Sequence, residues 1–204
     1  MESMRSVLSL FRDVSFVSIK DSGQTFLVNI TTLGQKPKQE EDEPASAWTA
    51  FISLDPSFPI CPTPEYVIRN TKALVSRSGV ATNIPHHFEL PAMATGELIA
   101  LGGNLLEYPV SYVPRDSDSG SFLSGIPLNV YHCYVITADS NTQRTIMRFS
   151  CPTKLADRQP DLHPNVLSKR IQDRWQPRLS VVEGHGWHEA KVSMELKTLE
   201  RVAL

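Results

Sequence analysis

Two runs of alternating apolar and polar residues, 128–137 and 142–151, constrain the fold of this chain more than any other feature. Alternation with a period of two places one set of side chains on a buried face and the other on a solvated face, as in an antiparallel sheet. The residues between the runs, Ala-Asp-Ser-Asn at 138–141, are typical of a tight turn. The two runs therefore predict a β-hairpin.

Further β-rich runs predict the rest of the strands. Residues 14–20 and 25–32 flank an Asp-Ser-Gly turn signal and predict a second hairpin. Residues 188–198 alternate Ala190, Val192, Met194 and Leu196 with polar residues, which predicts a half-buried strand. Short strands are also expected at 47–54, 86–93, 97–103 and 105–113.

Helices are expected at three places. The stretch "CPTPEYVIRN" has two interpretations, a displayed proline-rich peptide or a helix start. Thr63 suits an N-cap and Pro64 suits the first helical position, so we favour a helix over 63–78. A second helix is expected near 164–175 and an amphipathic helix near the N-terminus.

Many short strands with few helices are typical of an α+β fold, mainly an antiparallel β-sandwich or barrel with two or three peripheral helices. A length of 204 residues suits a single β-rich domain over 1–204. Within it we expect the N-terminal amphipathic helix at 1–13. Residues 33–46, with four consecutive acids and two prolines, predict an exposed acidic loop.

The N-terminal segment carries an apolar stripe with helical spacing, Met4, Val7, Leu8 and Phe11. Such a stripe either packs on its own domain, forms an oligomer interface or lies on a membrane surface. We expect it to act as an oligomer interface when its own domain does not cover it.

Composition favours an intracellular protein. No apolar run approaches the ~20 residues of a membrane-spanning helix. The first residues lack the apolar block of a secretory signal, and the three cysteines cannot all pair within one chain. The net charge of −2 argues against a surface wholly committed to phosphate, although residues 152–204 carry nine Lys and Arg against seven Asp and Glu.

Two basic groups are candidate contacts for a membrane or a nucleic acid. Arg69 and Lys72 share the exposed face of the expected helix at 63–78. The second group surrounds a tryptophan that could stack on a base or lie at a lipid headgroup layer, and it comprises Lys169, Arg170, Arg174, Trp175 and Arg178. The alternative is a solvated helix face with a packed tryptophan.

The most enzyme-like stretch is "EGHGWHE", in which His185, His188 and Glu189 could ligate a metal. Its two glycines and the strand pattern after it favour an ordinary turn instead. No nucleophile elbow, P-loop or paired Cys-x-x-Cys occurs. We therefore expect a non-enzymatic protein without cofactor or metal, and keep a metal-dependent hydrolase using His185 and His188 as an alternative.

Three segments in order resemble part of a known family: "EPASAWTAFISLDPSFP", "EYVIRNTKALVSRSG" and "IPHHFELPAMATGEL". They are similar to the N-terminal half of the matrix proteins of non-segmented negative-strand RNA viruses, particularly the pneumovirus type. The three segments together cover about a quarter of the chain, and within them the matching positions are Pro44 to Ser46, Trp48 to Leu54, Val67 to Val75, Gly79 and Pro85 to Phe88.

The resemblance implies a β-sandwich that self-associates into a layer and contacts lipid and nucleocapsid. The expected function is then a viral structural or assembly protein, found in the host cytoplasm, at the membrane periphery or within the virion. Its partners would be further copies of itself, an anionic membrane surface and viral ribonucleoprotein. An alternative is a protein-binding β-sandwich module without membrane or RNA contact.

Overall fold

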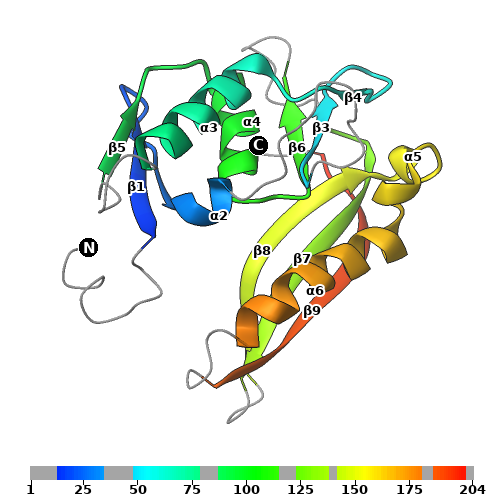
Figure 1. Ribbon diagram of the computed structural model, residues 1–204. Helices are drawn as coiled ribbons and strands as arrows, with labels where there is room; N and C mark the ends of the chain where they lie inside the picture. Colours follow the sequence, from blue (N-terminus) through cyan, green and yellow to red (C-terminus); the bar gives the residue numbers. More distant parts are fainter. Residues whose placement is uncertain are drawn as a thin grey trace. The chain divides into compact units, whose positions relative to one another are not determined.

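The computed structural model describes residues 13–34, 48–78, 87–114, 123–137, 142–180 and 186–200. In these ranges the fold is α+β, with nine strands in three three-stranded sheets and five α-helices (Figure 1). Four of the six strand pairs are antiparallel. The predicted α+β class with mainly antiparallel pairing is confirmed, and none of the three sheets closes into a barrel within the described ranges.

The chain divides into two compact units, Met1–Asp118 and Ser119–Leu204, and each has its own buried cluster of apolar side chains. We describe each unit by itself. A single domain over 1–204 stays a prediction, because a domain can contain two compact units. The helix count exceeds the predicted two or three, since the short α2 and α5 give no helical period to recognise and α4 was expected as a strand.

In unit 1, the first sheet has the order β2-β1-β5. The predicted hairpin is confirmed as β1 (Val14–Ile19) and β2 (Thr25–Asn29), and β5 (His87–Leu90) pairs in parallel with β1. The expected second strand is too long, because residues 30–32 begin α2 (Ile30–Gly34). Asn29 Oδ1 accepts the Thr32 backbone N–H at 2.9 Å and so favours a helical turn there.

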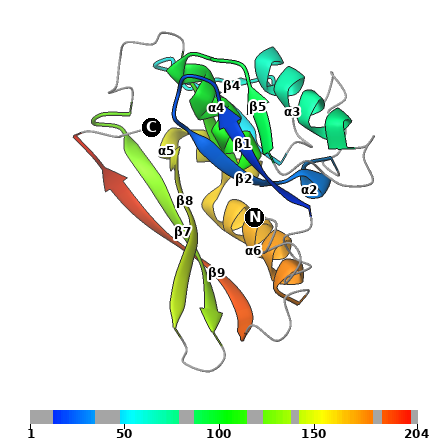
Figure 2. The same ribbon diagram turned by 90° about the vertical axis from the view of Figure 1, so that its left-hand side faces the viewer.

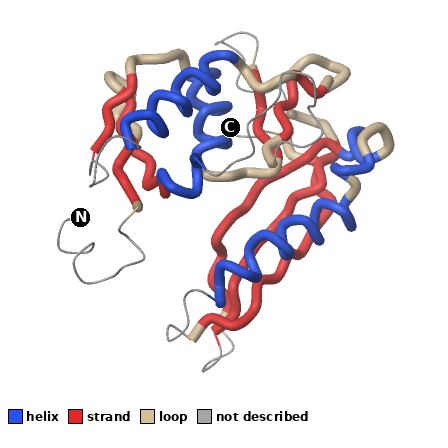
Figure 3. Tube along the Cα trace, in the orientation of Figure 1, coloured by secondary structure: helices blue, strands red, loops and turns tan. Residues whose placement is uncertain are grey.

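The second sheet of unit 1 contains β3 (Ala50–Ser53), β4 (Ile60–Cys61) and β6 (Val110–Val113), with β3 at its centre. The predicted helix after the proline stretch is confirmed as α3 (Glu65–Ser78). Val67 and Leu74 on its apolar stripe are buried, and Arg69 and Lys72 are exposed as expected. Helices α3 and α4 contact one another in this unit (Figure 3).

The expected strand at 97–103 is wrong: this segment belongs to helix α4 (Thr95–Leu105). The backbone N–H of Ala94 donates to the Glu97 carboxylate at 3.0 Å, which stabilises the first helical turn. Ala100, Leu101 and Leu105 are buried within the core of unit 1. A short apolar helix that is buried on most sides has the same sequence appearance as a buried strand.

Unit 2 contains the third sheet, with the order β8-β7-β9 (Figure 2). The central hairpin is confirmed as β7 (Pro127–Thr137) with β8 (Gln143–Pro152), and a register shift lies between Cys133 and Tyr134. The predicted final strand is confirmed as β9 (Trp187–Thr198), antiparallel to β7. Tyr131 stacks on Phe149 across the hairpin, with ring centroids 4.7 Å apart.

The connection from β8 to β9 is largely helical. Residues 152–162 contain α5 (Thr153–Ala156) and a 3-10 turn (Pro160–Leu162), and the predicted helix near 164–175 extends further as α6 (Pro164–Ser180). Leu167, Ile171 and Leu179 are buried along one side of α6. Helix α6 packs against the sheet, where Leu179 and the half-buried Trp175 contact Val135 of β7 and Ala190 of β9.

Several predictions lie outside the described residues. These are nearly all of the helix at 1–13 with Met4, Val7, Leu8 and Phe11, most of the acidic loop at 33–46, the resemblance positions Pro44 to Ser46, Gly79, Pro85 and His86, and His185. The loop prediction fails at its start, because Leu33 and Gly34 belong to α2. In the described ranges, no helix has both the length and the apolar character needed to span a membrane.

Candidate functional site

Strand β9 forms one edge of the sheet in unit 2. It pairs with β7 from Pro127 opposite Thr198 to Thr137 opposite Trp187, with one register shift at Ile136 and Thr137. Within the described ranges, no strand pairs with the other side of β9. An edge strand presents a row of backbone N–H and C=O groups that can pair with another chain. The outer side of β9 is therefore a candidate interaction site.

Two glutamines of α6 occupy the beginning of this edge. Gln176 accepts the backbone N–H of Ala190 at 3.0 Å and donates to the carbonyl of His188 at 3.0 Å. Gln172 donates to the carbonyl of Ala190 at 3.4 Å. These side chains bond the edge backbone as a neighbouring strand would, so they close the edge around Ala190.

The rest of the edge has no such cover within the described part of the chain. In an antiparallel strand, alternate residues direct both backbone groups to the same side. Since Ala190 directs its N–H outward to Gln176 and the register beyond it is regular, Val192, Met194 and Leu196 also direct theirs outward. We call residues 192–196 of β9 the open edge.

Two apolar side chains of the open edge are exposed. Ala190, on the α6 side of the sheet, is only 5% exposed, and side chains two residues apart lie on the same face of a strand. On that face Met194 is 42% exposed and Leu196 is 66% exposed. The apolar stripe predicted for this strand is thus buried at Ala190 and exposed at Met194 and Leu196.

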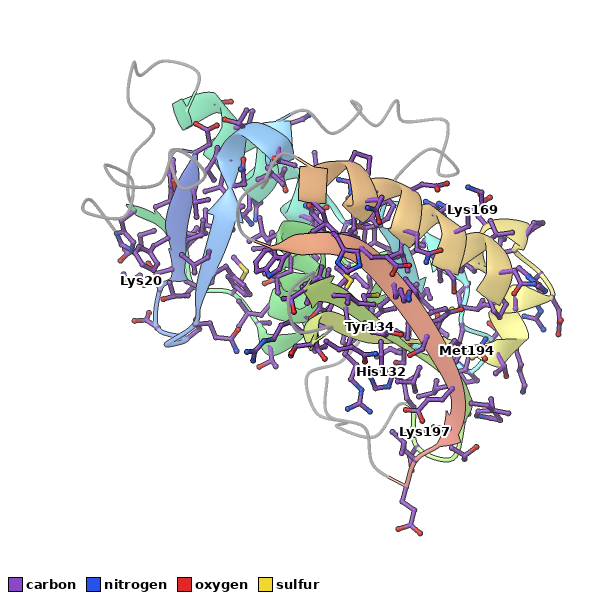
Figure 4. The ribbon with its side chains drawn as sticks, turned by 90° about the horizontal axis from the view of Figure 1, so that it is seen from below. Lys20, His132, Tyr134, Lys169, Met194 and Lys197 are labelled. Carbon is purple, nitrogen blue, oxygen red and sulfur yellow. The ribbon has the colours of Figure 1, made fainter. Side chains whose placement is uncertain are left out.

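The opposite face of the sheet carries a charged cluster around Glu195. His132 Nε2 lies 2.8 Å and Lys197 Nζ lies 2.6 Å from the same carboxylate oxygen, Glu195 Oε1. The hydrogen bond from Lys197, followed by that from His132, lowers the pKa of Glu195 below its ordinary value. Figure 4 shows Lys197 and Met194 along β9 and His132 on the same sheet.

A second ion pair lies on the same face of β9, between Lys191 Nζ and Glu189 Oε2 at 3.0 Å. This face of β9 therefore carries Glu189 and Lys191 before the uncharged Ser193, and Glu195 and Lys197 after it. The His132 pair joins β7 to β9 across the sheet, which stabilises the register of the edge strand.

The structure separates the basic residues predicted from sequence into the two units. Arg69 and Lys72 lie on α3 in unit 1, and the other group lies on α6 in unit 2. Lys169 forms an exposed ion pair with Asp173 at 2.6 Å. Arg170 Nη1 donates to the carbonyl of Asp161 at 3.4 Å.

Trp175 takes part in packing between α6 and the sheet. Its ring joins the cluster of Val135, Leu179 and Ala190, and the Arg178 guanidinium lies 4.9 Å from the ring centroid. The Trp175 Nε1 and Arg174 Nε atoms are buried. These contacts agree with the packed tryptophan that the sequence left as an alternative, and the role of the basic residues toward lipid or RNA stays a prediction.

The residues of the expected metal site do not form a cluster in the described part of the chain. The exposed His188 is the second residue of β9, and Glu189 pairs with Lys191. No group of three metal-binding side chains occurs among the described residues, which do not include His185.

A serine and a histidine meet on the first sheet of unit 1. Ser18 Oγ lies 2.7 Å from His87 Nε2, and its hydroxyl also lies 3.4 Å from the Phe88 carbonyl. A nucleophilic serine needs a base that a third group orients. Among the described residues no third side chain bonds the His87 ring, so the pair by itself is a surface hydrogen bond.

A family model described as a domain of unknown function, DUF4504, matches residues 1–204 of the chain. The chain belongs to the DUF4504 family. No curated protein and no solved structure matches it. Membership of DUF4504 assigns no activity, so the function of this member has to be argued from its own residues.

Sequence reasoning missed the open edge of this DUF4504 protein. It found the alternation in β9, but whether a strand has a second neighbour depends on contacts far along the chain. One local signal was present. Gln172 and Gln176 are four apart, which places both on one face of α6, and glutamines beside a buried stripe can bond a nearby backbone.

Proposed function

We propose that this protein is a non-enzymatic interaction module that binds an extended segment of another polypeptide along the open edge of β9. One observation carries the proposal. The outward backbone groups of Val192, Met194 and Leu196 have no strand beside them in the described part of the chain, next to exposed Met194 and Leu196 side chains.

Addition of a strand to a sheet edge is a common mode of protein recognition. Main-chain hydrogen bonds give affinity, and alternate side chains give specificity. Here a bound strand would hydrogen-bond to the outward N–H and C=O groups of three alternate residues, which have no strand partner among the described residues. Its side chains on the α6 side would cover Met194 and Leu196, and removal of apolar surface from water favours association.

The rest of the sheet supports a rigid edge. Gln176 bonds α6 to β9, and the Glu195 carboxylate joins Lys197 to His132 of the central strand. A strand that is held in its register before binding loses little conformational freedom on binding. The polar groups of the sheet are thereby used in structural contacts, which favours a binding role over catalysis.

The matrix-like role and the sandwich arrangement stay predictions. So do contacts of Arg69, Lys72 and the basic residues of α6 with an anionic membrane or a ribonucleoprotein. The proposed module needs none of these contacts, and it corresponds to the protein-binding alternative considered from the sequence.

Site-specific photo-cross-linking tests the proposal. A photoreactive side chain at Leu196 should give a defined adduct in cells that express the full chain. The control is the same photoreactive side chain at Val166, an exposed apolar residue on α6 rather than on an edge strand. The adduct at 196 should disappear when Met194→Pro removes one outward N–H. No adduct at 196, or equal adducts at 196 and 166, would refute the proposal.

A further inference from the structure

We infer that the polypeptide bound at the open edge is a second copy of this chain, whose β9 pairs antiparallel with the first across a two-fold axis at Ser193. This inference rests on the proposed function and adds the identity of the partner. A two-fold contact requires a surface that complements itself. The charges of β9 meet this requirement.

The charged residues of β9 reverse their sign when the strand is read backwards around Ser193. In an antiparallel pair centred there, Lys191 comes opposite Glu195 of the second copy, and Glu189 comes opposite Lys197. The two-fold axis generates each contact twice. Opposite charges across a strand pair stabilise it, and like charges directly opposite destabilise it.

Neighbouring registers lack this complementarity. A two-fold axis at Met194 places Lys191 opposite Lys197 of the second copy. A two-fold axis at Glu195 places this carboxylate directly opposite Glu195 of the second copy. A shift of one strand by a single residue relative to the other brings the apolar face of one copy to the same side as the charged face of the other. The exposed Leu196 would then lie beside charged residues of the second copy. The axis at Ser193 is therefore the register that the charges favour.

The backbone and the apolar face agree with this register. Val192 and Met194 direct their backbone groups outward, so each forms a hydrogen-bonded pair with the other residue of the second copy. On the α6 side, Leu196 comes opposite the small Ala190 of the second copy. Since Gln176 already bonds the backbone of Ala190, the ladder is limited to its central pairs and side chains make the outer contacts.

Two charge-reversal variants of the full chain test the register. Lys191→Glu places two pairs of like charges across the axis, and so does Glu195→Lys. Each variant alone should dimerise at least ~10-fold more weakly than the natural chain, and a 1:1 mixture should recover a heterodimer. Sedimentation velocity over a range of concentrations measures both effects. Circular dichroism checks that each variant is folded.

Other outcomes of the same measurement would overturn the inference. An axis at Met194 predicts that Lys191→Glu strengthens the dimer, because the introduced carboxylate would then face Lys197 of the second copy. A natural chain that stays monomeric at high concentration excludes the second copy. Equal self-association of both variants and the natural chain excludes β9 as the contact.

The cross-link at position 196 separates this inference from the proposed function. A homotypic adduct that Met194→Pro abolishes supports both. An adduct with a different polypeptide that is equally sensitive to Met194→Pro overturns the second copy and leaves the interaction module standing. Absence of any adduct at 196 refutes both. Met194→Ala, which keeps the backbone N–H, serves as the control for the proline variant.

Discussion

The side-chain oxygen of Gln176 accepts the backbone N–H of Ala190 at 3.0 Å, so a helix side chain takes the place of a neighbouring strand on β9. Its amide nitrogen bonds the His188 carbonyl at the same time. Among the described residues, the edge of the sheet is therefore covered by α6 at one end and has no neighbouring strand at the other, which is where we propose that another chain binds.

Removal of the Gln176 amide should destabilise unit 2. The variant Gln176→Ala loses two hydrogen bonds to the edge backbone, each contributing ~0.5–1.5 kcal/mol, so we expect a loss of ~1–3 kcal/mol in the free energy of unfolding. Urea denaturation measures this, and hydrogen exchange should show faster exchange at the Ala190 amide. The control is Gln143→Ala, an exposed glutamine of β8. Equal effects of both variants would contradict this role of Gln176.

Gly103 of α4 should not tolerate a side chain. A Cβ atom at this position would collide with the Ser111 side chain, which itself bonds the carbonyls of Ile99 and Ala100. We expect Gly103→Ala to destabilise the protein by ~1–3 kcal/mol, as overpacking of a core does. Thermal or urea unfolding is the measurement.

Two further variants decide whether this collision is the cause. In the first turn of the same helix, a Cβ at Gly96 would meet Pro114 at 3.4 Å, an ordinary contact. Gly96→Ala should therefore leave stability unchanged or raise it, because alanine favours a helix over glycine. Adding Ser111→Gly to Gly103→Ala should recover part of the loss. A double variant no more stable than Gly103→Ala would point to another cause.

The pKa of Glu195 should rise when Lys197 is replaced. The Lys197 hydrogen bond is the largest cause of the lowered pKa of this carboxyl, so Lys197→Met should move the pKa of Glu195 up toward its ordinary value. A carboxyl titration by NMR measures the shift. Lys191→Met, which removes the partner of Glu189, is the control and should leave the Glu195 titration nearly unchanged.

The lowered pKa of Glu195 should also make the free energy of unfolding depend on pH. A carboxyl whose folded pKa lies below its unfolded pKa, ~4.3 for glutamate, stabilises the fold above the unfolded pKa and loses that contribution as pH falls through the folded pKa. Glu195→Gln should therefore be less stable than the natural chain at neutral pH, and the difference should vanish in acid. A difference that grew in acid would contradict the assignment.

The three free cysteines should differ in reactivity toward thiol reagents. Burial raises the pKa of Cys133 to about 12 and that of Cys151 to about 12, and both side chains are almost fully covered. Cys61 is only partly buried, although burial raises its pKa as well. Because the thiolate is the reactive form, Cys61 should react first in the folded protein at mildly alkaline pH.

Mass spectrometry of the alkylated protein identifies which cysteines react. All three should react once the chain is unfolded in urea. The variant Cys61→Ser should remove the early reaction and keep the late ones. Fast labelling of Cys133 in the folded Cys61→Ser variant would contradict the packing of the central strand.

Local patterns predicted the elements that a single period describes. The β7–β8 hairpin and β9 followed from alternation, and α3 followed from Thr63-Pro64 and its apolar stripe. The register shift at Cys133 and Tyr134 did not, because the position of an extra residue depends on the partner strand. The prediction at α4 failed because Leu98 to Leu101 are consecutive apolar residues, so the period of the hydrophobic pattern cannot separate a helix from a strand.

The candidate site was predictable only in part. Alternation identified Met194 and Leu196 as members of one face, but their exposure depends on where α6 ends its cover. Which N–H groups of β9 point outward depends on which side of the strand pairs with β7, and no local pattern encodes that choice. Trp175 was recognised as a packing candidate, but its partner Ala190 lies fifteen residues later in a different element, and no local pattern encodes that contact.

The pairing of β7 with a local and a distant strand has a consequence for synthesis on the ribosome. Strand β8 begins at Gln143, six positions after β7 ends at Thr137, whereas β9 is translated only after α5 and α6. Until then the nascent chain carries β7 with one unpaired flank, which includes the backbone groups of His132 and Tyr134. During that interval chaperones would have a defined segment to protect, and a ribosome that stalls within α6 would leave this flank uncovered.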